Sequence, residues 1–181
     1  MTLTDATREF ILHWGEMGTR WGVNRTVAQV HALLYLSPES LTAEEIADSL
    51  SVARSNVSTS LKELQNWNLA QVDSRMGDRR DYFHTSSDVW TLFLTVVEQR
   101  VEREIVPTMT KLQRLAIEAR AERPAQPVTT ARITAMQVFL EEIHGWYTQI
   151  KKLPPSSLHA LISIGSGVTR FLPKVRRRRL D

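Results

Sequence analysis

The sequence contains no cysteine and no long run of apolar residues. The lack of cysteine excludes a disulfide framework, a thiolate nucleophile and a zinc site with Cys ligands. No apolar run approaches the roughly 20 residues that a membrane-spanning helix needs. Residues 1–5 also lack the charged and apolar regions of a signal peptide. We therefore expect a soluble, cytoplasmic protein that does not enter a membrane.

The motifs of common catalytic sites are missing as well. The 5 histidines are scattered, and no His-x-x-x-His pair, Gly-x-Ser-x-Gly turn or phosphate-binding loop occurs. His13 and Glu16 are two candidate metal ligands without a third. We therefore expect no enzymatic activity, no metal and no cofactor.

Charge is unevenly distributed along the chain. Residues 1–87 carry 8 Lys/Arg against 11 Asp/Glu, residues 88–169 carry 9 against 8, and the last twelve residues carry 6 against 1. The net positive charge therefore comes from the basic tail, residues 174–181. Such a tail is either a solvated segment or a source of non-specific attraction to phosphates, which weakens steeply with salt.

Residues 42–83 carry the most informative pattern. Thr42 followed three residues later by Glu45 is a capping box, which fixes the start of a helix over residues 42–50. This helix is expected to bury Ile46, Ala47 and Leu50. A second helix is predicted over residues 54–67, with a polar face opposite its apolar positions. Those apolar positions are Val57, Leu61 and Leu64.

A hairpin is predicted after the second helix. Its strands are residues 69–75 and 79–84, joined by a turn at residues 76–78. Two further helices, over residues 5–20 and 26–36, precede the capping box, and three glycines between residues 14 and 22 suggest a turn there. A helix sized for the major groove beside an arginine-bearing hairpin indicates a winged helix-turn-helix that binds DNA.

The second half of the chain has long amphipathic helices. Ser87 and Asp88 are placed to cap a helix from residue 89 to residue 115, which Pro107 should kink or break. A linker is expected at residues 120–127 because it contains two prolines.

Another helix is predicted to start after the linker, with Thr129 or Thr130 as its cap, and to end before Pro154. A last helix is predicted over residues 156–171, with a bend at its two glycines, Gly165 and Gly167. Because helices of this kind bury their apolar stripes against a partner, we expect a homodimer.

Several motifs of the first half resemble the GbsR branch of the MarR-type transcriptional regulators. They occur in the same order as in that branch and cover nearly half of the chain. The matching segments are residues 15–18, 21–25, 41–47, 56–58, 61–64, 77–83 and 88–90. The resemblance implies a dimeric winged-helix repressor or activator with a helical dimerisation and effector domain.

The sequence departs from the family just before the second helix of the motif. Ser51 and Ala53 stand where Gly and a capping Ser are usual, and Ser55 stands where a small Gly is frequent. Losing the capping hydroxyl costs roughly 1 kcal/mol, which is too little to abolish the fold. The phosphate contact of that hydroxyl then falls to Ser55 or Ser51.

The predicted DNA contacts lie on the second helix and on the wing. Their side chains are short and polar, or basic, as base edges and phosphates require. The predicted residues are Arg54, Ser55, Asn56, Ser58, Thr59, Lys62, Arg75, Arg79 and Arg80. The alternative is that the residues of the second helix form an ordinary solvated face and that the wing arginines are ordinary charges of a hairpin. Asp78 is expected to form the turn and to orient an arginine.

Aromatic residues suggest a small-molecule site, because family members sense choline-like quaternary ammonium compounds and aromatic faces attract such cations. The candidate walls are Trp14, Trp21, Trp90, Trp146 and Tyr147. The plain alternative is that these rings belong to the core.

The sequence thus predicts a mainly α-helical protein with a small β-hairpin wing. Its predicted parts are a DNA-binding domain at residues 1–87, a helical dimerisation and effector domain at residues 88–173, and the basic tail. Our hypothesis is a regulator, of the repressor type, that binds pseudo-palindromic double-stranded DNA as a homodimer. The first helix would share in the dimer interface. The alternatives are a protein-interaction module and a non-specific DNA binder driven by the tail.

Overall fold

The computed structural model describes residues 3–122, 126–154, 157, 158 and 160. The chain divides after Arg100 into two compact units. The first unit contains α1 (Asp5–Arg20), α2 (Arg25–Leu36), β1 (Leu41–Thr42), α3 (Ala43–Leu50), α4 (Arg54–Asn66), β2 (Gln71–Ser74), β3 (Asp81–His84) and α5 (Val89–Arg100). The second contains the π-helical segment η1 (Val101–Ile105), α6 (Val106–Ala121) and α7 (Pro127–Ile150).

The three strands form a small antiparallel sheet in the order β1-β3-β2. Leu41 pairs with Phe83, and Ser74 pairs with Asp81 next to the turn of the hairpin. The turn between β2 and β3 contains Gly77 at φ +81°, a left-handed conformation that glycine adopts without strain. Helices with this small sheet confirm the predicted fold class.

Local caps define the helices of the winged-helix motif. Thr42 accepts a hydrogen bond from the backbone N–H of Glu45, and the Glu45 carboxylate accepts one from the backbone N–H of Thr42, so the predicted capping box is confirmed. At the start of α4, Ala53 makes no side-chain cap. Asp88 caps α5 by accepting from the backbone N–H groups of Trp90 and Thr91.

The expected turn between residues 14 and 22 is shorter than predicted. Gly15 and Gly18 lie inside α1, and only Gly22, at φ +78°, lies in the turn. The two helical glycines serve close packing instead: a Cβ on Gly18 would lie 2.5 Å from the Cβ of Ala28 in α2. The prediction treated all three glycines as turn residues because it could not see this contact.

The core of the first unit lies between the helices and the sheet. Its most deeply buried side chains come from α2, α3 and α4: Val30, Leu33, Ile46, Val57 and Leu61. Burying each such side chain stabilises the fold by about 1.5–3 kcal/mol. The predicted burial of Ile46 and Ala47 is confirmed, whereas Leu50 is only half-buried because it ends α3 at the edge of the core.

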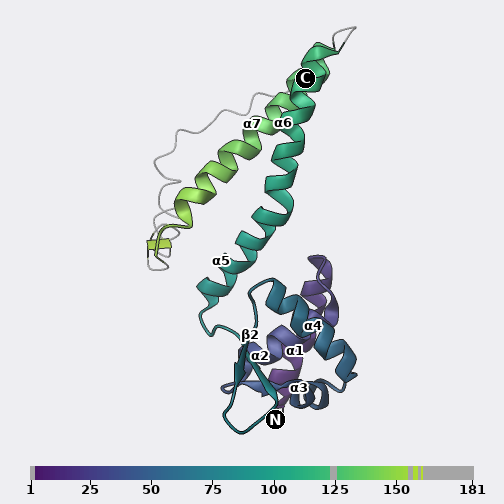
Figure 1. Ribbon diagram of the computed structural model, residues 1–181, viewed down its shortest axis with the longest axis vertical. Coiled ribbons are helices and arrows are strands. Elements are labelled where there is room, and N and C mark those ends of the chain that lie inside the picture. Colours follow the sequence, from purple (N-terminus) through teal and green to yellow (C-terminus); the bar gives the residue numbers. More distant parts are fainter. Residues whose placement is uncertain (1–2, 123–125, 155–156, 159, 161–181) are drawn as a thin grey trace. The chain divides into compact units, whose positions relative to one another are not determined.

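The second unit is a helical hairpin in which α6 and α7 run side by side (Figure 1). Ala116, Ala119 and Tyr147 are buried. The predicted disruption at Pro107 is confirmed as the π-helical segment η1 just before it. Proline lacks the backbone N–H that would complete a regular turn, and π-helical turns absorb such interruptions.

The predicted cap of α7 was wrong. The helix begins at Pro127, and Gln126 at the cap position makes no side-chain cap. Thr130 lies inside the first turn, where its hydroxyl donates to the carbonyl oxygens of Ala119 and Gln126. Proline at the first helical position has a suitable fixed φ and starts the helix earlier than the threonines would.

Other predictions concern residues with little or no description. Most of the last predicted helix, residues 156–171, its two glycines and the basic tail lie outside the described residues. Among the described helices, none combines the length and apolar character that crossing a membrane requires.

Candidate nucleic-acid interface and aromatic cavity

One face of α4 is polar and exposed. Val57, Ser60, Leu61 and Leu64 are buried on the opposite face, which fixes the rotation of the helix. The exposed side chains are Ser55, Asn56, Ser58, Thr59 and Lys62. The Thr59 hydroxyl donates to the carbonyl oxygen of Ser55 at 3.0 Å, so it can still accept a hydrogen bond from a ligand.

Arg54, at the start of α4, is paired within the protein. Its Nη1 lies 2.9 Å from Oε1 of Glu44 on α3, and both side chains are more than half exposed. Such an exposed pair contributes little to stability. It orients the guanidinium and offsets its charge at this surface.

The tip of the wing, residues 75–82, contains a hydrogen-bonded brace. Nη2 of Arg80 donates to Oδ2 of Asp78 at 2.6 Å, and Nε of Arg80 donates to Oδ1 at 3.0 Å. The Tyr82 hydroxyl donates to the same carboxylate at 2.7 Å and accepts from Nη2 of Arg80 at 2.8 Å. This network holds the Arg80 guanidinium in a fixed orientation.

The brace shifts the pKa values of its members. Hydrogen bonds from Arg80 and then Tyr82 hold the pKa of Asp78 well below its usual value. The Asp78 carboxylate raises the pKa of Arg80 and also raises the pKa of Tyr82. The carboxylate and the guanidinium are therefore both charged at physiological pH.

The wing arginines differ in their contacts. The Arg75 guanidinium lies over the Tyr82 ring, 3.8 Å from its centroid. Within the described part of the chain, neither Arg79 nor Lys62 makes an ion pair or a side-chain hydrogen bond. These two cations are exposed and available to an external partner.

A groove of about 410 Å³ separates α4 from the wing. Side chains from the start of α3, from α4 and from the hairpin line it together. Among the predicted DNA-contact residues, the groove brings together Arg54, Ser58, Lys62, Arg79 and Arg80. Ser55, Asn56, Thr59 and Arg75 are exposed but are not part of its lining.

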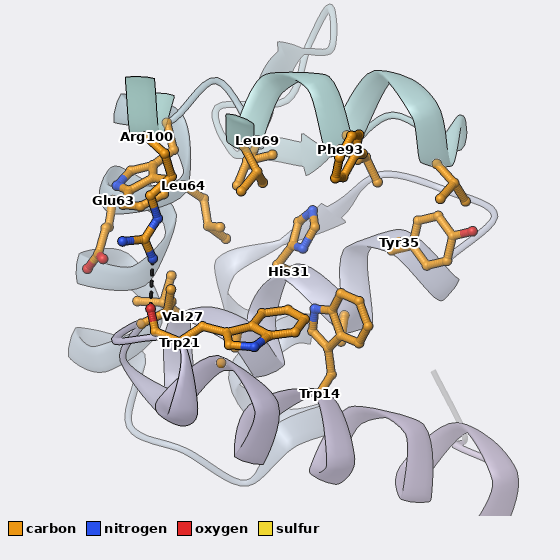
Figure 2. Close-up of a pocket in the computed structure, with 18 of the residues that line it drawn as sticks. Trp14, Trp21, Val27, His31, Tyr35, Glu63, Leu64, Leu69, Phe93 and Arg100 are labelled. Atoms are coloured by element: carbon orange, nitrogen blue, oxygen red, sulfur yellow. Dashed lines mark hydrogen bonds between the residues drawn. The ribbon is translucent and has the colours of Figure 1, made fainter. Parts of the chain in front are cut away.

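A cavity of about 470 Å³ lies at the C-terminal end of α4, between α1, α2 and α5 (Figure 2). Its wall is apolar and rich in aromatic rings: Phe10, Trp14, Trp21, Tyr35, Trp67 and Phe93. In the view of Figure 2, His31 lies between Trp14 and Trp21 on one side and Leu69 and Phe93 on the other. The volume falls in the range of small-molecule sites.

The lining includes an imidazole, a carboxylate and a guanidinium. Burial lowers the pKa of His31 to about 4, so its ring is neutral at physiological pH, and its Nε2 lies 3.4 Å from the Thr85 hydroxyl. Nη2 of Arg100 donates to the carbonyl oxygen of Trp21 at 2.7 Å (Figure 2). Glu63, on α4, also lines the cavity.

The structure brings together only part of the predicted aromatic set. Trp14 and Trp21 meet edge to face in the cavity wall at 6.2 Å. Trp90 lies outside the lining and contacts Phe93. Trp146 and Tyr147 belong to α7 of the second unit.

Sequence reasoning missed other members of both sites. It missed the rings of Phe10, Tyr35, Trp67 and Phe93, and it missed His31, Arg100 and Tyr82. Phe10 and Trp14 stand four residues apart on one helix, a spacing that places both rings on one face. His31 and Tyr35 likewise stand four residues apart on α2, and Phe93 and Arg100 stand seven apart on α5. No such spacing relates these helices to one another, or to Trp67 and Tyr82.

Comparison with known proteins identifies the winged-helix part. The MarR family matches residues 21–81. The HTH-type transcriptional repressor GbsR of Bacillus subtilis (strain 168) is 25% identical over 93 residues, which are 51% of this chain and 51% of that protein. The chain spans about half the length of the curated relatives it matches.

A solved structure shows the same fold. The crystal structure of a transcriptional regulator is similar over 80% of this chain and 95% of that chain, with 23% identity and a TM-score of 0.62. Together with the match to residues 21–81, this likeness confirms the resemblance indicated by the sequence motifs. The winged-helix part of the chain, over residues 21–81, is thus similar to the MarR family.

Proposed function

We propose that this protein is a DNA-binding transcriptional repressor that places α4 in the major groove and the wing in the flanking minor groove. One observation carries the proposal: part of the polar exposed face of α4, with Ser58 and Lys62, lines a single groove together with two arginines of the wing, Arg79 and Arg80. The repressor role also draws on the name of the relative GbsR.

The chemistry of α4 suits base reading. Its 13 residues give a helix of about 20 Å, which fits across the major groove. Asn56 offers an amide that can pair with adenine through two hydrogen bonds. Ser55, Ser58 and Thr59 can contact bases or phosphates at short range, and Lys62 supplies a charge for a phosphate.

The wing offers two arginines with different roles. Within the described residues Arg79 makes no ion pair and is exposed, so it can enter a minor groove and follow its width. Asp78 holds the Arg80 guanidinium and is therefore a positioning residue. Because the Arg80 side chain is already ordered, it loses little rotamer freedom when it contacts DNA.

A homodimer is proposed through the second unit. Four exposed apolar side chains recur at intervals of three and four along α7: Met136, Phe139, Ile143 and Trp146. A helix with such a stripe normally buries it against a partner. Dimers of winged helices bind two half-sites about one DNA turn apart.

Ligand response is proposed at the aromatic cavity, because α4 contributes both to the DNA-facing groove and to the cavity wall. An occupant of the cavity can then act on the DNA-binding helix directly.

The proposed DNA binding is tested with duplexes selected from a random library by the full chain. Asn56→Ala and Arg79→Ala should each weaken binding to the selected duplex by about 1–3 kcal/mol, the usual cost of a lost base or groove contact. Arg8→Ala is the matched control, since Arg8 is exposed on α1 and lies outside the groove. Fluorescence anisotropy at physiological salt with competitor DNA gives the affinities.

Two outcomes would contradict sequence-specific binding. If both variants bind the selected duplex as the wild type does, the motif is a protein-interaction module. If deletion of residues 174–181 removes most of the affinity, the protein is a non-specific binder driven by its tail.

The dimer is tested by Phe139→Glu in the full chain, with Gln149→Glu as the control at another exposed position of α7. Sedimentation velocity should show dissociation for Phe139→Glu alone, because a carboxylate in an apolar interface is left without a partner. Equal association of both variants contradicts the proposed interface.

A further inference from the structure

The tip of the wing contains an exposed apolar side chain, Met76. Among the described residues it is the most exposed of the large apolar side chains: it is fully exposed, whereas the next, Ile117, exposes 66% of its surface. A single exposed apolar residue is common on protein surfaces and by itself indicates no site. What distinguishes Met76 is its position, which the contacts of its neighbours fix.

A hydrogen-bonded turn places Met76 at the apex of the hairpin. The backbone N–H of Asp78 donates to the carbonyl oxygen of Arg75 at 3.1 Å, which closes a β-turn with Met76 as its second residue. Both end residues of the turn are anchored on the buried Tyr82 of β3. The Arg75 guanidinium lies 3.8 Å from the centroid of the Tyr82 ring, and the Tyr82 hydroxyl donates to Asp78 at 2.7 Å. Met76 therefore projects into solvent from a fixed frame.

Positive charge is concentrated around this turn. Residues 75–80 contain three arginines and one aspartate, whereas residues 1–87 as a whole carry 8 basic against 11 acidic side chains. An apolar tip among arginines suits a partner that is anionic outside and apolar inside. The minor groove of DNA has this character, because phosphates follow its edges and stacked base pairs form its floor. A membrane surface is also anionic, but one methionine offers far less apolar surface than the helix faces that bind to membranes.

We propose that Met76 is a wedge, whose thioether side chain inserts between two base pairs in the minor groove and partly unstacks them. This inference rests on the proposed function, in which the wing enters that groove. Proteins that bind the minor groove frequently insert an apolar side chain, methionine among them, between base pairs and kink the duplex. Methionine is unbranched and flexible, so it can fill the irregular gap between two separated base pairs.

A wedge makes the protein select DNA that deforms easily. Pyrimidine–purine steps such as TpA are easily unstacked, whereas A-tracts are stiff and have a narrow minor groove that attracts arginine. Met76 and Arg79 therefore give opposite preferences beneath the wing, since the wedge favours TpA and the arginine favours an A-tract. Met76 is then a specificity-determining residue that acts without a hydrogen bond to any base.

The test compares the full-length wild type with Met76→Ala, Met76→Leu and the control Met17→Ala on variants of the selected duplex. These duplexes differ only in one flanking step, TpA or the ApA of an A-tract, which is moved through successive positions. Under the wing, the wild type and Met76→Leu should bind the TpA duplex at least about fivefold more tightly than the ApA duplex, because leucine is also an apolar wedge. Met76→Ala should lose or reverse this ratio. Met17→Ala should keep it, since Met17 lies on α1 outside both the groove and the cavity.

A second measurement reports unstacking directly. 2-Aminopurine in place of the TpA adenine gains fluorescence when it loses its stacking, so its emission should rise when the wild type binds and stay low with Met76→Ala.

The outcomes separate failure of the wedge from failure of DNA binding. The wedge alone is overturned if the wild type binds the selected duplex, but its TpA preference and its emission change equal those of Met76→Ala. If the wild type binds no duplex in preference to competitor DNA, the proposed function and the wedge fail together. If binding that depends on Met76 occurs only with phosphatidylglycerol vesicles, the tip contacts membranes and the wedge is wrong.

Discussion

The buried His31 should make the stability of this protein depend on pH between 6.5 and 5. Its side chain is 9% exposed, in the wall of the aromatic cavity, and burial lowers its pKa from 6.5 to about 4. In this range the unfolded chain takes up a proton at His31, whereas the folded protein does not. The free energy of unfolding therefore falls as the pH falls from 6.5 towards 4, and the full contribution of neutral His31 to stability is present above pH 6.5.

The size of the effect follows from the two pKa values. Each pH unit between them lowers the free energy of unfolding by about 1.4 kcal/mol, so the loss from pH 7 to pH 5 is about 2 kcal/mol. The carboxylates with lowered pKa values, which include Asp78, Glu45 and Asp88, also lose stabilising ionisation in acid. Their unfolded-state pKa values are near 4, so they contribute mainly below pH 5.

Urea denaturation of the wild type and His31→Gln at pH 7, 6 and 5 measures this dependence. Glutamine stays neutral and can still hydrogen-bond with the Thr85 hydroxyl, the partner of His31 at 3.4 Å. The wild type should lose about 2 kcal/mol over this range, and the variant should lose much less. The same pH dependence in both proteins would refute the assignment to His31.

Three further substitutions test particular contacts. Gly18→Ala should lower the free energy of unfolding by about 1–3 kcal/mol, because the new methyl would lie 2.5 Å from a side chain of α2. Gly145→Ala, with nothing within 4 Å of the new methyl, should leave the free energy of unfolding unchanged or raise it. Urea denaturation of both variants tests this difference. Thr42→Ala should lower the free energy of unfolding by about 1 kcal/mol, because α3 loses its cap, and Thr42→Ser should stay close to the wild type in the same assay. Equal stability of the two variants would show that the hydroxyl is dispensable. Asp78→Asn should raise the affinity for random DNA, because it removes a negative charge. It should also lower the ratio of the affinity for the selected duplex to the affinity for random DNA, because Arg80 loses its fixed orientation. An equal rise of both affinities, measured by anisotropy, would mean that Asp78 acts only through its charge.

Much of the first unit was predictable because its helices are specified locally. The capping box at Thr42 and the i, i+4, i+7 apolar spacing in α4 depend only on near neighbours in sequence. The hairpin was predictable for the same reason, since Gly77 in a polar turn allows a tight reversal. The predicted start of α7 was wrong because two local signals competed there, and the helix begins at Pro127 rather than after a capping threonine.

The sites were less predictable because they depend on contacts between distant residues. The aromatic cavity draws lining residues from between Phe10 and Arg100, and no spacing rule relates Trp67 to Arg100. The brace in the wing could be anticipated only in part. Asp78 suggested an arginine partner, but the strand register that places Tyr82 on the same carboxylate appears only in the folded hairpin.

The internal pairing of charges limits how strongly salt should act on DNA binding. The proposed DNA-binding surface has five cations, of which Arg54 and Arg80 are paired with carboxylates and Arg75 covers the Tyr82 ring. If only Lys62 and Arg79 neutralise phosphates, the logarithm of the binding constant should fall with a slope of about −2 per protomer against the logarithm of the salt concentration.

If all five cations neutralise phosphates, the slope becomes about −4.5 per protomer. A chain lacking residues 174–181 measures the slope of this surface alone, and the full chain then gives the contribution of the tail. A slope near −4.5 in the shortened chain would refute the shielding of the paired arginines, because DNA would then have displaced Glu44 and Asp78 from them. A slope near −2 means that this surface neutralises only about two phosphates per protomer, as expected for residues 1–87, which carry more acidic than basic side chains.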